Sequence, residues 1–197
     1  MPLVGLTGGM GAGKSTALEA LGRLGAAVLS TDAIVHELYL GPQLRDAVVE
    51  RWGHEVAPGG VVDRAAVAQR AFAGEEDRRW LESLIWPLVG ARVFAWLEDV
   101  RAGRDGPRQP PAAVVEVPLL FESGMEAGYD ATIAVVSEES VRGERARRRG
   151  HALQDERAAR QLTQEEKARR ATFVVRNDGT REDLERELSA VLDKLTA

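Results

Sequence analysis

Short apolar runs alternate with longer stretches of helical periodicity along this 197-residue chain. The apolar runs are only a few residues long and rich in valine, leucine and alanine, as is typical of strands that are buried on both faces. We expect five of them, near residues 3–6, 26–30, 113–117, 131–136 and 173–175. Strands that alternate with helices predict an α/β protein with a doubly wound parallel sheet.

Helical periodicity fills the segments between these runs. Residues 33–51 form a stretch of alternating polarity that we expect to be helical. Residues 76–101 carry apolar side chains at three- and four-residue spacings, and Pro87 is expected to kink or break this second stretch. The block over 33–111 is too long for a simple crossover, so we expect an inserted helical subdomain there. The chain is thus predicted to be one domain, with its core at about 1–32, 112–137 and 171–197, the insertion at about 33–111 and a helical lid at about 138–170.

A glycine-rich segment over residues 8–15 reads Gly-Gly-Met-Gly-Ala-Gly-Lys-Ser, which is the G-x-x-x-x-G-K-S phosphate-binding loop, or P-loop. It follows the first expected strand and precedes a helix, where backbone N–H groups and the helix N-terminus cradle phosphates. Lys14 is placed to reach the β- and γ-phosphates, and Ser15 to ligate Mg²⁺. An incidental glycine-rich turn would lack this context. The segment predicts binding of a nucleoside triphosphate with Mg²⁺.

Composition narrows the function classes. The net charge of −5 argues against a dedicated nucleic-acid binder, and the absence of cysteine excludes disulfides, zinc–thiolate sites and cysteine catalysis. No apolar run approaches the ~20 residues that span a bilayer, and no signal peptide fits the start of the chain. We therefore expect a cytoplasmic protein without nucleic-acid or membrane partners. Either a monomer or a small homo-oligomer is compatible with the sequence.

Two carboxylates lie at the expected carboxyl ends of strands, where open α/β sheets bind their ligands. Asp32 follows the second strand and is a candidate to accept the proton of an attacking hydroxyl, or to bind Mg²⁺ through water. Glu116, at the end of the third strand, is a candidate for the Mg²⁺ shell. The structural alternatives are an N-cap for Asp32, and a turn residue or ion-pair partner for Glu116.

Residues 142–149 hold five arginines and one glutamate within an acidic protein. Arg142, Arg145 and Arg149 would share one helix face. Such a face suits a lid that stabilises the charge on transferring phosphates, although a solvated helix face or an RNA-contacting patch would look the same.

Further segments accompany the P-loop in a fixed order: Thr31 to Ile34, Gly60 to Arg64, Leu81 to Leu88, Pro-Leu-Leu-Phe-Glu at 118–122, Arg145 with Arg149, Arg157 with Gln161, and Phe173 to Gly179. Together with residues 5–16 they resemble the dephospho-coenzyme A kinases over nearly the whole chain. Many families share the P-loop, but few carry Pro-Leu-Leu-Phe-Glu at this distance from it.

The resemblance implies a P-loop kinase fold with an inserted substrate subdomain and an arginine-rich lid. It implies transfer of the ATP γ-phosphoryl group to the ribose 3′-hydroxyl of dephospho-coenzyme A, the last step of coenzyme A synthesis. The implied catalytic residues are Lys14, Asp32, Arg145 and Arg149. The implied ATP-binding residues are Gly8, Gly9, Gly11, Ala12, Gly13, Lys14, Ser15, Thr16 and Asn177. The implied acceptor-binding residues are Thr7, Asp32, Arg64, Pro118, Leu119, Arg157 and Gln161.

The chain departs from the family pattern at four positions outside the P-loop. Ser30 replaces the first carboxylate of an Asp-Ala-Asp segment, His36 a common arginine, Trp86 a histidine, and Thr172 an aspartate.

Three other functions remain: a P-loop kinase for another small acceptor such as a nucleoside or nucleotide, a GTPase switch, and a nucleic-acid-dependent ATPase. A GTPase switch would need the guanine-binding motif Asn-Lys-x-Asp, which the sequence lacks. The acidic net charge disfavours a nucleic-acid-dependent ATPase. The choice between ATP and GTP as donor stays open.

Overall fold

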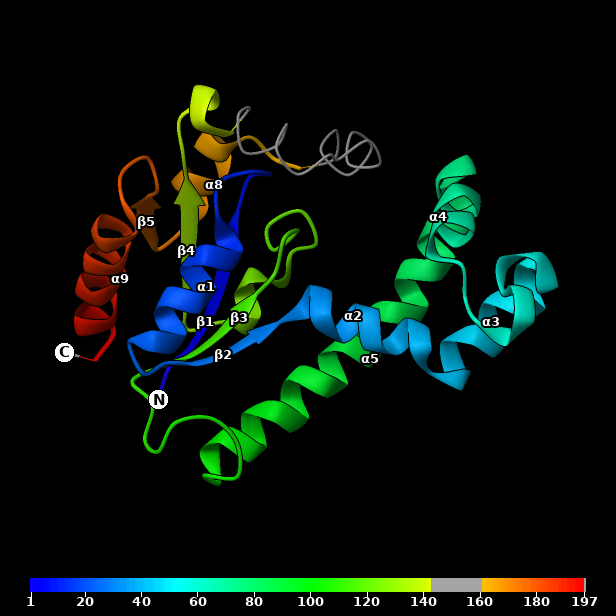
Figure 1. Ribbon diagram of the computed structural model, residues 1–197, viewed down its shortest axis with the longest axis horizontal. Helices are drawn as coiled ribbons and strands as arrows, with labels where there is room; N and C mark the ends of the chain where they lie inside the picture. Colours follow the sequence, from blue (N-terminus) through cyan, green and yellow to red (C-terminus); the bar gives the residue numbers. More distant parts are fainter. Residues whose placement is uncertain (143–160, 197) are drawn as a thin grey trace. The chain divides into compact units, whose positions relative to one another are not determined.

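The computed structural model of the chain describes residues 1–142 and 161–196. Within these residues five parallel strands form one sheet in the order β2-β3-β1-β4-β5 (Figure 1). The strands are β1 (Leu3–Gly8), β2 (Ala27–Ser30), β3 (Ala113–Glu116), β4 (Ala131–Val136) and β5 (Phe173–Arg176). The predicted parallel α/β sheet is therefore confirmed. β1 lies between β3 and β4, so the strand order reverses at the carboxyl end of β1, where ligands bind in such sheets.

The chain divides into two compact units, one formed by Met1–Ser30 with Leu97–Ala197 and the other by Thr31–Trp96. Residues from Leu97 onward, which include the end of the long helix and the loop after it, belong to the first unit. The helices are α1 (Lys14–Arg23), α2 (Thr31–Leu40), α3 (Pro42–Trp52), α4 (Arg64–Ala73), α5 (Glu75–Arg101), α8 (Gln164–Arg170) and α9 (Arg181–Thr196), with short 3-10 helices η1 (His54–Val56), η2 (Pro58–Gly60) and η3 (Met125–Gly128).

The core of the first unit follows from the alternation of side chains along β1. Val4 and Leu6 are fully buried with apolar residues of α1 and α9. The intervening residues face the other way, and a Cβ on Gly5 would lie 2.8 Å from Leu120 and 3.2 Å from the Tyr129 ring. Both faces of the central strand are thus covered, which explains its continuous apolar run.

The second unit has a separate apolar core, built mainly from α3, η1, α4 and α5. The helical stretch predicted over 33–51 is in fact two helices, because Gly41 adopts an extended conformation before Pro42 at the start of α3. Of the two outcomes expected at Pro87, the break is wrong, since α5 runs through it as one helix, and the kink stays a prediction. Trp80, Ile85 and Val89, on both sides of the proline, pack into the core, and this packing offsets the ~3 kcal/mol that an internal proline costs.

No helix within residues 1–142 or 161–196 is both long enough and apolar enough to cross a membrane.

Candidate active site

The P-loop connects the carboxyl end of β1 to the first turn of α1. A Cβ on Gly8 would overlap the carbonyl oxygen of Val135 in β4, so only glycine fits where the loop leaves the sheet. Gly13 caps α1 with φ 94°, in the left-handed region that favours glycine. The predicted loop residues Gly9, Gly11 and Ala12 lie between these two points. The motif therefore has the strand–loop–helix geometry that aims backbone N–H groups at an anion.

Two distant segments fix the loop. Asn177, which follows β5 and is 6% exposed, donates from Nδ2 to the Ala12 carbonyl at 2.8 Å. The Arg142 guanidinium donates from Nε to the Met10 carbonyl at 3.1 Å, and its other side pairs with Glu139. These two bonds occupy carbonyl groups and use none of the loop amides, of which the Ala12 amide donates to the Gly9 carbonyl at 3.2 Å. The loop is thus held from outside, as a preorganised phosphate site requires.

The charged and hydroxyl side chains of the motif lie at the start of α1. The Lys14 ammonium donates to the Gly8 and Gly9 carbonyls at 3.1 and 3.2 Å, so its charge is held over the loop. Ser15 is exposed, and Thr16 is half-buried one residue further along α1. A cation and a hydroxyl therefore flank the N-terminus of this helix.

Glu116 ends β3 and pairs in register with Ser30 at the end of β2. Glu116 is 5% exposed, and its carboxylate accepts a hydrogen bond from the Ser30 hydroxyl at 3.1 Å. In the described part of the chain no three His, Cys, Asp or Glu side chains gather as a metal site. Nucleotide-bound Mg²⁺ needs no such cluster, because it takes oxygen ligands from one or two side chains, phosphates and water. The Ser15 hydroxyl and the Glu116 carboxylate could each supply an oxygen ligand of this kind.

The segment after β3 contacts β1 directly beneath the P-loop. The Thr7 hydroxyl donates to the Pro118 carbonyl at 3.2 Å. The Lys167 ammonium of α8 donates to the same carbonyl at 2.7 Å and pairs with Glu122 at 2.9 Å. Burial lowers the pKa of Lys167, while the hydrogen bond and charge of Glu122 oppose this shift. Three of the predicted acceptor residues, Thr7, Pro118 and the adjacent Leu119, thus lie together at this edge of the sheet.

The remaining predicted acceptor residues of the described chain belong to the second unit, apart from Gln161. Asp32 is exposed in the first turn of α2, so it lies inside the helix and does not precede it as an N-cap would. Arg64 starts α4 and donates to His36 Nδ1 at 2.9 Å, while its guanidinium lies 5.4 Å from the Tyr39 ring centroid. His36 is one helical turn from Asp32, so Arg64 contacts the face of α2 that carries Asp32.

Arg145, Arg149 and Arg157, predicted for the lid and the acceptor site, lie outside the described residues. Gln161 is half-buried and directly precedes Leu162, whose amide donates to Glu122 at 2.8 Å.

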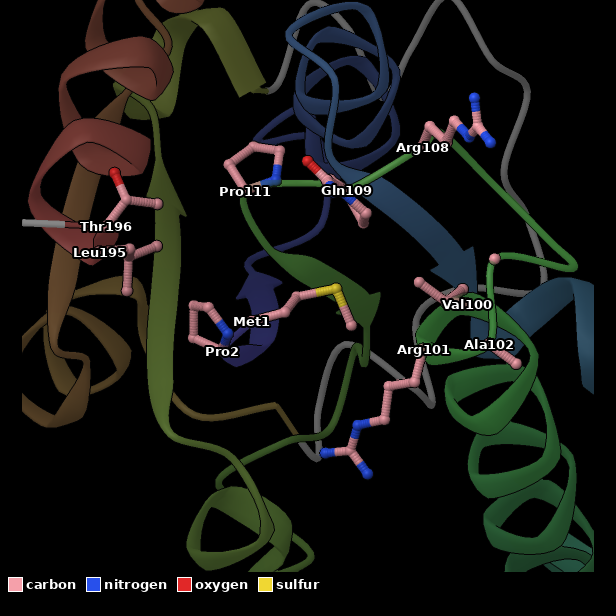
Figure 2. A pocket seen from close by; sticks show the side chains of 12 residues that line it. Met1, Pro2, Val100, Arg101, Ala102, Arg108, Gln109, Pro111, Leu195 and Thr196 are labelled. Carbon is pink, nitrogen blue, oxygen red and sulfur yellow. The ribbon is translucent and has the colours of Figure 1, made fainter.

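A cavity of about 800 Å³ opens at the opposite edge of the sheet (Figure 2). Its wall includes Pro2, which precedes β1, and Pro111, which precedes β3, together with Arg101 and Leu195. The six residues of β1 separate this edge from the P-loop by roughly 20 Å at the usual rise per strand residue. The cavity therefore does not belong to the phosphate site.

Reasoning from the sequence missed the buried polar groups behind the P-loop. Lys167 is one, and Gln164 is another: its side-chain amide exchanges two hydrogen bonds of 2.9 Å with the backbone of Ser137. The sequence did carry one signal for Lys167, the rarity of lysine: only three of the 26 lysines and arginines are lysines, so each lysine stands out. Nothing in the local pattern distinguishes Gln164 from its polar neighbours.

Three of the four residues that depart from the family pattern form hydrogen bonds in the structure. Ser30 binds Glu116, and His36 binds Arg64, as described above. Thr172 exchanges 3.0 Å hydrogen bonds with Thr132, each hydroxyl accepting from the amide of the other residue. Trp86 is 40% exposed on α5. The first two departures therefore touch candidate site residues.

Comparisons with known proteins agree with this geometry. Residues 2–183 match the profile of the family described as Dephospho-CoA kinase. A curated dephospho-CoA kinase of Deinococcus radiodurans is 39% identical over 195 residues, which cover 98% of this chain and 91% of the relative. The crystal structure of TT1252 from Thermus thermophilus superposes with a TM-score of 0.73 at 33% identity, covering 100% of this chain and 98% of that one. The dephospho-CoA kinase of Campylobacter jejuni shares the fold, with a TM-score of 0.68 at 22% identity over 98% of this chain and 96% of that one.

Proposed function

The chain belongs to the dephospho-CoA kinase family, and from this premise we propose that it transfers the γ-phosphoryl group of ATP to the ribose 3′-hydroxyl of dephospho-coenzyme A. The products are coenzyme A and ADP. The observation that carries the proposal is the combination of a complete P-loop with the Pro118–Glu122 segment held against the same strand. The match to the family profile and the curated relative confirm the family resemblance predicted from the sequence.

We assign the donor site to the P-loop. Its amides, the N-terminus of α1 and the Lys14 ammonium neutralise the phosphates, and Asn177 and Arg142 hold the loop in shape. The transition state of phosphoryl transfer is loose, so positioning and charge stabilisation contribute more than strong base catalysis. A loop anchored before the ligand arrives needs little reorganisation during the reaction.

We assign binding of the acceptor to Asp32 and Arg64 in particular. Asp32 orients the 3′-hydroxyl or takes its proton, and Arg64 binds phosphates of the acceptor. Tyr39 and His36 hold the Arg64 guanidinium from its face and its edge, which preorganises it for bidentate contact with an anion. Thr7, Pro118, Leu119 and Gln161 complete the acceptor contacts.

Ser15 and Glu116 are the residues that would hold Mg²⁺, directly or through water. When bound, the ion neutralises charge on the phosphate oxygens. The lid arginines Arg145 and Arg149, together with Arg157, are proposed to gather further positive charge around the substrates. The proposal also includes a cytoplasmic location, a monomer or small homo-oligomer, and no nucleic-acid or membrane partner.

The test is an ADP-release assay with ATP, Mg²⁺ and dephospho-coenzyme A, with the product identified by mass. We expect the acceptor to gain one phosphoryl group, and Lys14→Ala to abolish the gain. ATP binding without transfer would refute the proposed function.

A panel of nucleosides and nucleotides in place of dephospho-coenzyme A tests the other kinase interpretation. GTP in place of ATP determines the donor preference. Faster turnover with any other acceptor would replace dephospho-coenzyme A as the substrate.

A further inference from the structure

Lys167 is a buried ammonium group with three oxygen partners. Its side chain is fully buried, and Nζ lies 2.7 Å from the Pro118 carbonyl, 2.9 Å from Glu122 Oε1 and 3.4 Å from the Thr7 hydroxyl. A lysine ammonium has three N–H donors, so each can be directed at one of these oxygens. None of the roles assigned above uses this group.

Stability alone explains the pair of Lys167 and Glu122 poorly. Removing two charges from water costs free energy, and apolar side chains of similar volume often replace a buried ion pair without loss. The pair is also incompletely satisfied: Glu122 Oε2 is buried and accepts no hydrogen bond from any residue in 1–142 or 161–196. A core that needed only packing would do as well without either charge.

The group does join segments that are far apart in the sequence. Thr7 lies in β1 directly before Gly8, the first residue of the P-loop, and Pro118 lies two residues after the end of β3. Glu122 ends the Pro118–Glu122 segment and accepts from the Leu162 amide at 2.8 Å, just before α8. Lys167 is therefore the one side chain in the described structure that donates to both Thr7 and Pro118, from a helix 160 residues along the chain from Thr7.

We infer that Lys167 is a positioning residue of the acceptor site, which fixes the backbone of Pro118 and Leu119 against the P-loop strand. Glu122 acts through Lys167 by holding its ammonium in place. The inference rests on the proposed function, in which Thr7, Pro118 and Leu119 contact dephospho-coenzyme A. The donor site has its own anchors in Asn177 and Arg142, so ATP binding does not depend on this contact.

Steady-state kinetics of Lys167→Met and of the double variant Lys167→Met/Glu122→Met test the inference. The single variant leaves the Glu122 carboxylate buried without its cation and is expected to lower Tm. The double variant removes both charges and is expected to recover most of that Tm. In both, the KM for dephospho-coenzyme A should rise about tenfold while the KM for ATP changes less than about threefold.

A purely structural role would give a different result. Val191→Ala shortens a buried side chain in α9, away from this contact, and serves as the matched control: it should lower Tm and leave both KM values unchanged. If the double variant folds and keeps the wild-type KM for dephospho-coenzyme A, the inference is wrong. It is also wrong if the double variant does not fold, because the pair would then be required for stability.

The wild-type enzyme separates this inference from the proposed function. Wild-type protein that does not phosphorylate dephospho-coenzyme A refutes the proposed function itself. Active wild-type protein with an unaffected double variant refutes only the role of Lys167.

Discussion

The P-loop and the α2 face around Asp32 are built in different ways. The P-loop consists of backbone groups held by buried partners, such as the Asn177 amide and the Val135 carbonyl that excludes a Cβ at Gly8. The α2 face consists of exposed side chains, with Arg64 held by the rings of His36 and Tyr39. Backbone geometry fixes the phosphate site, whereas exposed side chains form the α2 part of the proposed acceptor site.

The difference indicates how each region tolerates change. A site made of backbone amides depends on glycines that allow its geometry and on side chains that hold the loop. In the P-loop, one charged side chain, that of Lys14, adds to these amides. A site made of exposed side chains can be altered residue by residue with little effect on folding. The substitutions below use this contrast, from the largest expected effect to the smallest.

Lys14→Ala should have the largest effect, because it removes the only side-chain cation of the P-loop motif itself. We expect kcat to fall about a thousandfold, a loss typical of removing a group that stabilises transition-state charge. The measurement is ADP release at saturating substrates. Lys194→Ala, an exposed lysine of α9, is the control and should leave kcat unchanged. A fully active Lys14→Ala enzyme would falsify the mechanism.

Asp32→Asn should lower kcat about a hundredfold, at the lower end for general-base groups because the transition state is loose. The KM values should change little, since the amide keeps the size of the carboxylate. Glu37→Gln, also exposed on α2, provides the matched control. Equal kcat for the two variants would leave Asp32 as an ordinary helix residue and would remove catalysis from the α2 face.

Arg64→Lys should raise the KM for dephospho-coenzyme A about tenfold with a small change in kcat, because lysine keeps the charge but loses the planar fork that His36 and Tyr39 hold. Arg45→Lys in the same unit, where Arg45 pairs with Asp46 on the surface, should behave like wild type. The readout is initial rate against acceptor concentration. An unchanged KM would show that the acceptor phosphates bind elsewhere.

Asp183→Asn should have the smallest effect and alter neither site. Asp183 accepts from the Thr180 amide at 3.0 Å and from the Thr180 hydroxyl at 2.8 Å, and these bonds lower its pKa. A lowered pKa stabilises the fold above the usual aspartate value of about 3.9, and this contribution is lost as pH falls through the folded-state pKa. The Tm difference between wild type and variant should therefore be largest near neutral pH and vanish in acid. A difference that grows in acid would contradict this.

Local sequence patterns predicted the P-loop and the five strands, because each depends on residues that are neighbours in the chain. The position of Asp32 near the end of β2 could be predicted in the same way, since only Thr31 separates it from Ser30. The break considered at Pro87 does not occur, because Trp80 and Ile85 pack against other helices on that part of α5. Tertiary packing outweighed a local preference there.

The environment of Lys167 could not be predicted, for a related reason. Lys167 lies in α8, and its partners come from β1 and from the segment after β3; periodicity does not place such segments side by side. The roles of Asp32, Arg64, Ser15 and Glu116 remain predictions, as do those of the lid arginines.

The burial of Lys167 gives the protein an unusual chemical footprint. Of its three lysines, one is sealed in the core, one lies in the P-loop and one is exposed on α9. An amine-acylating reagent should therefore modify only Lys14 and Lys194 among the lysines of the native enzyme. Bound nucleotide should shield Lys14 alone, so the ratio of the two labelled peptides by mass spectrometry would titrate nucleotide occupancy without any measurement of turnover.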